Sequence, residues 1–587
     1  MATLVDDVLE NILARKIDKQ DALRSFNVLS EEEKQRIVAG LRSKLRSDDE
    51  APPEENLPIP TPARTLKSVH EADLSEQQKR YIEALSRQYA NRVPKSKQNA
   101  LQHQVYFVDQ RKVAGLKRPL KSMQFQLTYD RAEGAYLYDV DGNKYVDITG
   151  DNGVNFFGHQ PEFMKKALTE RLHRGYPLVA YSEDLFEVAR LFCEITGHER
   201  MVFAQSGTEA VMWALRIARA ATGRKKVVIF DGSYHGLSDN VLALKGRNGA
   251  SMVAGLGLLQ EFADQLIILD YGDMDQLDVI EKRAHEIACV LIEPIQSRFP
   301  ARQPIEFVQE LRKLTLEKDI VLIFDEMVTG FRAGRKGAEA FFSVKPDLAT
   351  YGKVPGGGLP TGIIAGLAKY LDYVDGGVWG FDDASMPSLK RAVMAGTHTQ
   401  NSLKVSATLA VCQEMVRLCD MGRDCTYGSC PCAIGTLNRK AASMCEEINA
   451  YFREKRVPLV VDYFSSLFRF NVTDDPYGFV RELLILLLRI NGVETSTSGN
   501  CFLNLAHSDD DIRAVADGFR KSVDTLLEQN CFYEAGAEAK TATASAAQPP
   551  KAADTAIRVP ADSGKTQIDR LRALLLADLR SIDDRGN

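Results

Sequence analysis

Asp325 and Lys353 are the pair of residues whose types and surroundings best suit chemistry. Asp325 lies near the end of the apolar run IVLIFDE at 320–326, and Lys353 lies in the glycine-rich segment TYGKVPGGGLPTG at 350–362. In parallel α/β sheets, ligand groups gather at the carboxyl ends of strands, and glycines let the backbone approach a bound group closely. An amine that attacks an aldehyde and a carboxylate that keeps a ring nitrogen protonated are what pyridoxal 5'-phosphate (PLP) chemistry needs.

Each of these two residues alone has an ordinary structural explanation. A strand-end aspartate is usually a helix cap or a satisfied core carboxylate, and an isolated lysine is usually solvated. The interpretation therefore rests on their combination. Because the lysine must be neutral to attack an aldehyde, we expect burial or a nearby positive charge to lower the pKa of Lys353.

Two further segments could hold the phosphate and the ring of such a cofactor. QSGTEA at 205–210 follows the strand-like run MVFA and opens a helical pattern, so Ser206, Gly207 and Thr208 can offer N–H and hydroxyl groups to an anion. A capped helix start without any ligand would look the same. DGSYHG supplies Tyr234, whose ring could stack on a flat heteroaromatic cofactor.

The pattern between about residues 120 and 530 indicates the α/β fold class. Short β-branched runs such as VVIF at 227–230, LIIL at 266–269 and CVLIEP at 289–294 alternate with helical patterns. Such alternation predicts a mainly parallel sheet covered by helices. The catalytic residues would then lie at one edge of that sheet.

Both ends of the chain read as appendages. Before the catalytic region we predict a helical element at 1–47, a proline-rich and acidic linker at 48–72 and a helical lead-in at 73–120, which starts at a capping box of Ser75 and Gln78. After it we predict a disordered linker at 534–563 and an amphipathic helix at 564–583. The apolar stripes of the two terminal elements either bind a partner or fold back onto the enzyme.

Composition excludes several classes of protein. The chain has 587 residues, 44% hydrophobic, with a formal net charge of -6, so no overall positive field favours nucleic acid or an anionic membrane. The N-terminus lacks the basic and apolar pattern of a secretory signal. The apolar run at 483–488 is far shorter than the roughly 20 residues of a membrane helix. We expect a cytoplasmic enzyme without membrane spans.

The ten cysteines suit a reducing compartment in which thiols remain free. Four of them cluster, namely Cys419, Cys425, Cys430 and Cys432. Their spacing matches no paired C-x-x-C framework and no histidine lies nearby, so we expect incidental thiols and no metal site.

These segments occur in the same order as in class III, fold-type-I PLP aminotransferases. The chain resembles this family from about residue 120 to 530. Within the class it looks closest to glutamate-1-semialdehyde aminomutases and to aminotransferase domains of hybrid polyketide/nonribosomal peptide synthetases. The latter similarity lies in LIEPIQSR, NFFGHQPEF, NCFLNLAHSDDDI and the preceding run HQVYFVDQRKVAGLKRPLKSM.

The resemblance implies a fold and a set of site residues. A large PLP-binding domain at 176–404 with a seven-stranded-type, mainly parallel sheet would join a small α+β domain built from 121–175 and 405–533. Lys353 would form a Schiff base with PLP and shuttle a proton, and Asp325 would pair with the pyridinium nitrogen. The remaining implied contacts are Ser206, Gly207 and Thr208 to phosphate, Tyr234, His235 and Met327 at the ring, Glu293 near the 3'-hydroxyl, and Thr397 reaching phosphate across a homodimer interface.

The function implied is ping-pong amino transfer from a small-molecule amino donor. The synthetase resemblance suggests a β-keto acyl thioester on a carrier protein as acceptor, with the terminal helices docking to partners. An intramolecular aminomutase and a non-catalytic interaction protein on the same scaffold are the alternatives. Arg298 and Arg332 could bind a substrate carboxylate or form salt bridges. Pro355 after Val354 and Ser402 after Asn401 depart from the family pattern beside the pocket.

Overall fold

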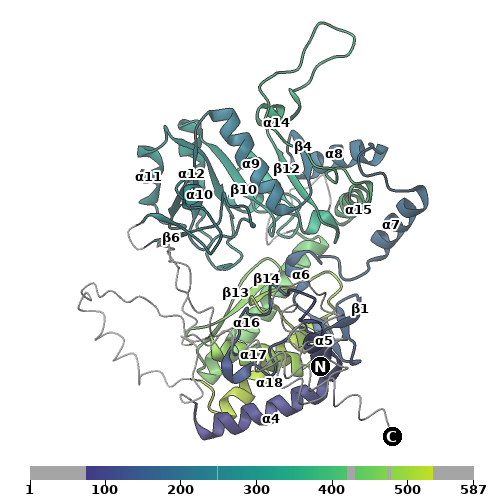
Figure 1. Cartoon of the computed structure of the whole chain (residues 1–587), viewed down its shortest axis with the longest axis vertical. Helices are drawn as coiled ribbons and strands as arrows, with labels where there is room; N and C mark the ends of the chain where they lie inside the picture. The colour runs from purple at the N-terminus through teal and green to yellow at the C-terminus, as the bar shows by residue number, and fades with distance from the viewer. Residues whose placement is uncertain (1–73, 247–248, 420–429, 474, 476–477, 533–587) are drawn as a thin grey trace, which may run out of the picture. The chain divides into compact units, whose positions relative to one another are not determined.

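The computed structural model describes residues 74–246, 249–419, 430–473, 475 and 478–532 (Figure 1). The predicted elements at 1–47, 48–72, 534–563 and 564–583 lie outside these residues, as does Cys425. Within the described part, contacts separate 237–269 as one compact unit from the rest as another. The domain boundaries expected from the sequence stay predictions.

The central sheet has seven strands in the order β4-β12-β11-β10-β9-β5-β8. Neighbours from β11 to β5 run parallel, whereas β12 is antiparallel to both β11 and β4. The prediction of a mainly parallel seven-stranded sheet is confirmed. The strands are β4 (Arg200–Ala204), β5 (Lys226–Phe230), β8 (Leu266–Leu269), β9 (Ile287–Ile292), β10 (Val321–Asp325), β11 (Leu348–Tyr351) and β12 (Gly362–Gly366).

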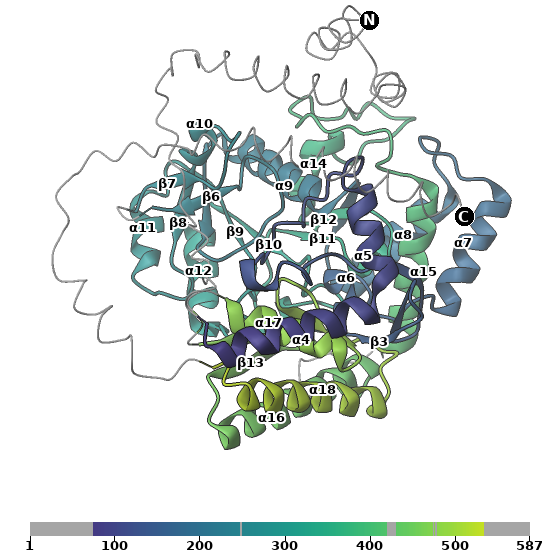
Figure 2. The ribbon, with the colours of Figure 1, turned by 60° about the horizontal axis from the view of Figure 1, so that its bottom comes forward.

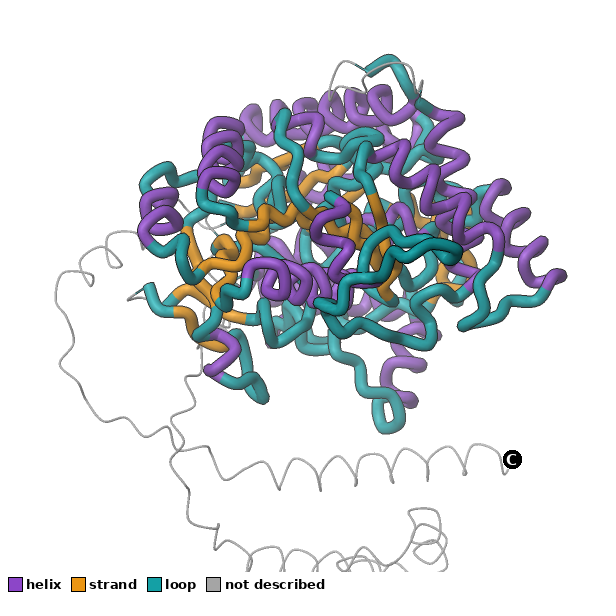
Figure 3. The backbone as a smooth tube through the Cα atoms, turned by 90° about the horizontal axis from the view of Figure 1, so that it is seen from above, coloured by secondary structure: helices purple, strands orange, loops and turns teal. Residues whose placement is uncertain are grey.

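Helices cover this sheet, and Figure 3 shows them outside the strands. Strands β9 and β10 are buried along their whole length, as expected for parallel strands with both faces covered. The helices of this part are α7 (Glu162–Arg174), α8 (Glu183–Thr196), α9 (Gly207–Thr222), α11 (Gln276–Lys282), α12 (Ile305–Glu317), α13 (Glu339–Phe342), η3 (Val354–Gly356), α14 (Ala368–Asp375) and α15 (Ser402–Leu418).

Two smaller sheets complete the larger unit. Strands β1, β2 and β3 pair antiparallel, and β15, more than 300 residues later in the chain, adds parallel to β3. Both ends of the catalytic region therefore build one α+β layer, as predicted. The strands are β1 (Tyr129–Glu133), β2 (Tyr136–Asp139), β3 (Lys144–Asp147) and β15 (Val493–Glu494), and the second sheet is β13 (Leu459–Phe464), β14 (Leu467–Val472) and β16 (Asn500–Phe502).

The lead-in lies beside the C-terminal helices, as Figure 2 shows for α4, α17 and α18. Ser75 and Gln78 form the predicted capping box at the start of α4. Arg489 of α17 donates to the Tyr89 hydroxyl of α4 over 2.8 Å. These elements are α4 (Glu76–Arg92), α5 (Pro94–His103), η2 (Arg118–Leu120), α6 (Gly150–Gly153), α16 (Ala433–Lys455), α17 (Phe479–Ile490) and α18 (Asp509–Glu528).

The smaller unit contains the antiparallel pair β6 (Ala243–Lys245) and β7 (Ser251–Val253), the short helix α10 (Gln260–Ala263) and strand β8. The Ser251 hydroxyl donates to the Leu266 carbonyl over 2.9 Å and fixes β7 to the start of β8. This unit contributes no residue to the predicted site.

The apolar run at 483–488 lies inside α17 and is buried, so its interpretation as a core helix is confirmed. In the part of the chain that the structure describes, no helix combines the length and apolar character of a membrane span. Every cysteine in that part is a free thiol. The same residues hold no group of three or more histidine, cysteine or carboxylate side chains that could bind a metal ion.

Candidate active site

Asp325 ends the middle strand β10, where it lies buried between β9 and β11. Its Oδ2 is 2.8 Å from Nδ1 of His235. Its Oδ1 accepts hydrogen bonds from the Met327 backbone N–H over 3.2 Å and from the Thr350 hydroxyl over 3.3 Å. These three contacts fix the position of the carboxylate at the end of β10.

Lys353 follows β11, the parallel neighbour of β10, and is half-buried just before η3. Burial lowers the pKa of the Lys353 amine, and the charge of Arg332 lowers it further, while Asp325 and Glu293 oppose the shift. The direction agrees with the lowered pKa expected from the sequence. The same effects place Asp325, Glu293 and Arg332 near this amine.

Ser206 caps the N-terminus of α9, since its hydroxyl accepts from the Glu209 N–H over 3.2 Å. The predicted helix start is therefore confirmed. N–H groups in the first turn of a helix have no intrahelical acceptor and carry partial positive charge, so this terminus suits an anion. A Cβ on Gly236 would come within 2.6 Å of the Thr208 hydroxyl, which shows how closely the 231–236 segment packs on the helix start.

Met327 joins this helix start to the lysine segment. A Cβ added to Gly207 would lie 2.8 Å from the Met327 sulfur, and a Cβ added to Gly352 would lie at the same distance from it. At Gly352 the Thr361 carbonyl, 2.9 Å from such a Cβ, also disfavours a side chain. The helix terminus that suits an anion and the residue preceding Lys353 thus both contact the Met327 side chain.

Glu293 follows β9 and ties the tyrosine segment to the site. Its carboxylate accepts from the Tyr234 N–H over 2.9 Å and from the Ser297 N–H over 3.2 Å. Burial raises the pKa of Glu293, and the negative charge of Asp325 raises it further. The Tyr234 side chain is half-exposed, with the Arg298 guanidinium 6.0 Å from its ring centroid. The ring therefore remains open to a ligand.

Thr397 lies on an exposed stretch between α14 and α15. Its neighbour Gly396 packs on Gln205 of the same chain, because a Cβ there would come within 2.6 Å of the Gln205 amide nitrogen. Gln205 immediately precedes Ser206. The contact of Thr397 with a partner subunit's cofactor stays a prediction.

Several residues of this cluster could not be named from the sequence. His235 was predicted to lie beside the ring, but its hydrogen bond with Asp325 was not predicted. Thr350 and Gln296 were also missed, and the Gln296 amide donates to the Asp231 carbonyl over 2.8 Å and to Ser233 Oγ over 3.0 Å. The available signal was a polar residue at a strand end, namely Thr350 in TYGK and Gln296 in EPIQS.

The structure gives different surroundings to Arg298 and Arg332, whose roles the sequence did not decide. Arg332 is fully buried, and its guanidinium donates to Ser466 Oγ over 2.8 Å and to the backbone carbonyls of Leu503 and Gly153. It makes no salt bridge with a described carboxylate, and its burial lowers its pKa to about 9. Arg298 is exposed beside Tyr234. Arg332 therefore ties three separate segments of the chain together, whereas Arg298 can reach a ligand.

The assembled groups fit PLP. They comprise a buried carboxylate for a ring nitrogen, an amine with lowered pKa for an aldehyde, a helix N-terminus for a phosphate and an open aromatic ring. In the described part, Nε2 of His235 and Oε1 of Gln296 are buried without a hydrogen-bond partner. Such orphaned atoms beside the cluster are typical of a site that binds a polar group.

Comparison with known proteins identifies the family. The model of the class-III aminotransferase family matches residues 119–418. The glutamate-1-semialdehyde 2,1-aminomutase of Archaeoglobus fulgidus is 30% identical over 428 residues, which are 70% of this chain and 96% of that protein. The corresponding enzyme of Methanosphaera stadtmanae is 34% identical over 300 residues, 50% of this chain and 68% of that protein.

Solved structures share the fold. An omega-transaminase from Sphaerobacter thermophilus has a TM-score of 0.62 at 25% identity and covers 73% of this chain and 97% of its own. A glutamate-1-semialdehyde aminomutase from Pseudomonas aeruginosa has a TM-score of 0.65 at 22% identity, covering 77% and 98%. The fold is that of the fold-type-I transaminases. The chain belongs to the class-III aminotransferase family and is a PLP-dependent enzyme of the transaminase type.

Proposed function

We propose that this enzyme moves an amino group from an amino acid donor to the carbonyl of a β-keto acyl thioester held on a carrier protein. The observation that carries the amino-transfer part is a lysine amine with lowered pKa beside a buried, hydrogen-bonded aspartate. When bound, PLP supplies an aldehyde that bonds to amines and a ring that accepts electrons.

Lys353 acts first as the amine that holds the cofactor and later as the group that moves a proton. Its lowered pKa keeps a larger fraction of the amine neutral near neutral pH, and a neutral amine is required for both tasks. The half-buried position of Lys353 limits the access of water to this proton. Lys353 is therefore the residue on which turnover depends most.

Asp325 would pair with the ring nitrogen of PLP, and the contact with His235 would keep the carboxylate in place. Met327 and Tyr234 would contact the ring, and Glu293 would serve its 3'-hydroxyl side. Ser206, Gly207 and Thr208 would bind the phosphate at the start of α9. Thr397 would complete the phosphate site across the interface of a homodimer.

The acceptor part of the proposal is supported by the segments LIEPIQSR, NFFGHQPEF and NCFLNLAHSDDDI, which resemble aminotransferase domains of polyketide/nonribosomal peptide synthetases. Helices α4 and α5 precede residue 119, where the family model begins. The terminal elements at 1–47 and 564–583 would dock carrier or synthase partners. Pull-down of candidate carrier proteins should lose signal when both elements are deleted, and an unchanged signal would refute docking.

Donor and acceptor can be tested separately. The purified enzyme loaded with PLP is mixed with single amino acids while the absorbance of the bound cofactor is followed. The enzyme treated with the active donor is then given a β-keto acyl carrier protein, and the acyl chain is analysed by mass spectrometry. We expect one or a few donors to change the spectrum and the acyl chain to gain an amino group. Amination of free keto acids without any amination of the carrier-bound chain would contradict the acceptor proposal.

An intramolecular aminomutase is the second candidate, because the curated relatives of 30% and 34% identity carry the name glutamate-1-semialdehyde 2,1-aminomutase. A mutase needs no external donor and releases no keto acid. Incubation with glutamate-1-semialdehyde alone distinguishes the two candidates. Formation of 5-aminolevulinate at a rate above that of any donor-dependent reaction would favour the mutase.

The assembly and location of the enzyme belong to the same proposal. A homodimer is expected, since Thr397 is exposed in the single chain while Gly396 beside it packs near the phosphate segment. Light scattering on the purified protein tests this state, and a monomer that binds PLP fully would contradict it. A cytoplasmic location fits the free thiols of the described cysteines.

A further inference from the structure

Arg469 lies on the face of the small antiparallel sheet that is turned toward the site. On β14, Leu467 pairs with Phe502 and Arg469 pairs with Asn500, so the two pairs are successive same-face positions of one ladder. Leu467 and Phe502 form a buried cluster with Val328, which follows Asp325 by three residues. The Arg469–Asn500 pair therefore continues the surface that packs on the loop after Asp325.

The guanidinium of Arg469 is surrounded by neutral acceptors. Nε donates to Asn471 Oδ1 over 3.1 Å, and Nη1 donates to the Ser498 carbonyl over 2.7 Å and to Asn500 Oδ1 over 2.6 Å. Among the described residues no carboxylate forms an ion pair with Arg469, and no acceptor contacts its Nη2. The side chain is thus held in place by three hydrogen bonds without an ion pair, although Asp462, its partner across the β13–β14 ladder, is close enough for its charge to act on Arg469.

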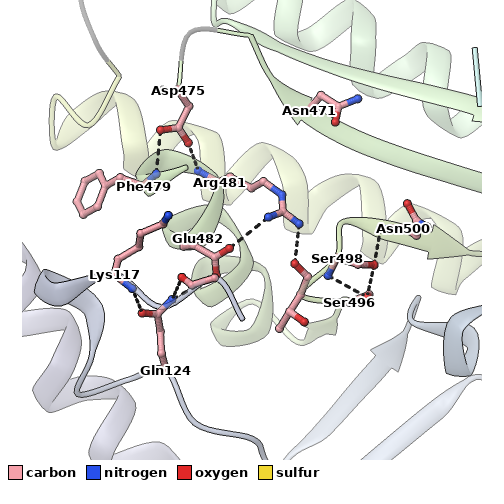
Figure 4. Close-up of polar contacts among 12 residues, drawn as sticks. Lys117, Gln124, Asn471, Asp475, Phe479, Arg481, Glu482, Ser496, Ser498 and Asn500 are labelled. Carbon is pink, nitrogen blue, oxygen red and sulfur yellow. Dashed lines mark hydrogen bonds and ion pairs between the residues drawn. The ribbon is translucent and has the colours of Figure 1, made fainter. Parts of the chain in front are cut away.

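A second arginine holds the same loop from the other side. Arg481 donates to the Thr497 carbonyl over 2.6 Å and to Glu482 over 3.2 Å, and Figure 4 shows it between Glu482 and the loop that carries Ser496 and Ser498. Burial, together with the nearby charges of Arg481 and Arg298, lowers the pKa of Arg469 to about 10, while Asp462 opposes the shift. Positive charge therefore accumulates around Arg469.

Arg298 connects this positive region with the cofactor site. It follows Ser297, whose N–H donates to Glu293, and its guanidinium lies over the ring of Tyr234. Arg298 is exposed and makes neither a hydrogen bond nor an ion pair with any described residue. Its charge acts on Arg469. The two guanidinium groups thus lie within electrostatic reach of each other, and that of Arg298 lies 6.0 Å from the centroid of the Tyr234 ring.

We propose that Arg298 and Arg469 together bind the carboxylate of the substrate that exchanges its amino group, and so select an acidic amino donor. This inference rests on the proposed function. Guanidinium groups bind carboxylates through paired, charge-assisted hydrogen bonds. A carboxylate here would pair with two guanidinium groups that form no ion pair with any described carboxylate. Because a thioester is neutral, the acceptor would not need this site, and the two half-reactions would depend on the arginines to different extents.

Direct binding provides the first test. Binding of glutarate, a dicarboxylate that has no amino group to transfer, is measured by calorimetry with the PLP-loaded enzyme and with the variants Arg298→Met and Arg469→Met. The matched control is Arg513→Met, which removes an exposed arginine of α18. We expect each site variant to weaken glutarate binding by roughly 10- to 100-fold. Unchanged affinity in Arg298→Met would overturn the inference, since that side chain has no hydrogen bond or ion pair with a described residue to lose.

Donor selectivity provides the second test. The ratio of kcat/KM for L-glutamate to kcat/KM for 1-phenylethylamine, which has no carboxylate, should fall roughly 10- to 100-fold in both variants and remain unchanged in Arg513→Met. An equal loss for the two donors would mean that the arginines support the fold instead. In the second half-reaction, kcat/KM is measured for a keto acid and for a neutral β-keto acyl thioester. A loss in the variants for the keto acid alone would show that the arginines also bind an acceptor carboxylate. If the unmodified enzyme uses no donor, the proposed function fails, while the glutarate titration still decides the arginine site.

Discussion

Nδ1 of His235 lies 2.8 Å from Oδ2 of Asp325, and both side chains are almost completely buried. The histidine stands directly after Tyr234, so one short segment presents a ring toward the cofactor and fixes the carboxylate behind it. This contact orients the aspartate at the end of β10.

Replacing His235 by phenylalanine should reduce kcat for the donor half-reaction by roughly 10- to 100-fold, because a hydrogen bond to a charged group contributes about 1.5–3 kcal/mol. Stopped-flow absorbance of the bound cofactor measures this rate. His285→Phe, at an exposed position between α11 and β9, is the control and should leave the rate unchanged. A His235→Phe enzyme with the original kcat would show that Asp325 needs no orienting partner.

Glu293→Gln should shift the pH dependence of cofactor attachment to lower pH. The negative charge of Glu293 raises the pKa of Lys353, so its removal lets burial lower that pKa further. A lowered pKa means that the amine becomes neutral at a lower pH, and the attachment rate should reach its plateau earlier. The measurement is the rate of PLP incorporation into apoenzyme between pH 6 and 10. Glu306→Gln on the exposed side of α12 is the control, and a shift toward higher pH would contradict the assignment.

Ser206→Ala and Ser508→Ala should separate stability from cofactor binding. Each serine caps a helix, α9 and α18 respectively, and the loss of either cap should cost about 1 kcal/mol of unfolding free energy. Ser206 alone lies at the proposed phosphate site. We expect both variants to lose similar stability in denaturant titrations of the apoenzyme, with weaker PLP affinity only in Ser206→Ala. Equal PLP affinity in the two variants would remove Ser206 from the phosphate site.

Glu482→Gln should change the pH dependence of stability. Burial raises the pKa of Glu482 from 4.5 to about 7, while Arg481 and Lys117 oppose the shift. A raised pKa in the folded state means that this group's stabilising contribution is complete below pH 4.5 and is lost as the pH rises through 7. Glutamine does not titrate, so the variant should gain stability relative to the parent between pH 5 and 8. Denaturant unfolding across this range tests it, and a constant difference would contradict the shift.

Hydrophobic pattern and helix capping made much of the fold predictable. The strands β5, β9 and β10 were read from continuous apolar runs, and the helix starts at Ser75 and Ser206 from their caps. These signals are local, since each depends on residues that are neighbours in the sequence. The class of chemistry was predictable for the same reason, because strand-end carboxylates and glycine-flanked lysines can be recognised in short segments.

Pairings across the chain could not be predicted in this way. His235 and Asp325 are separated by 90 positions and meet because β5 and β10 flank β9 in the sheet. Arg469 meets Asn500 only through the register of β14 with β16, and a slip of one residue would turn it to the other face. The burial of Arg332 likewise depends on loops from three separate regions. These contacts depend on the order of the strands and on their register, and neither can be recognised from short segments of the sequence.

The central claim is that Lys353 carries the cofactor, and chemical trapping tests it most directly. The enzyme is incubated with PLP, reduced with borohydride, digested and analysed by peptide mass spectrometry, alongside Lys353→Ala and the surface control Lys313→Ala. We predict one stable cofactor adduct, located on Lys353, which is absent in Lys353→Ala and present in Lys313→Ala. An adduct on a different lysine, or none in the parent enzyme with excess PLP, would contradict the account.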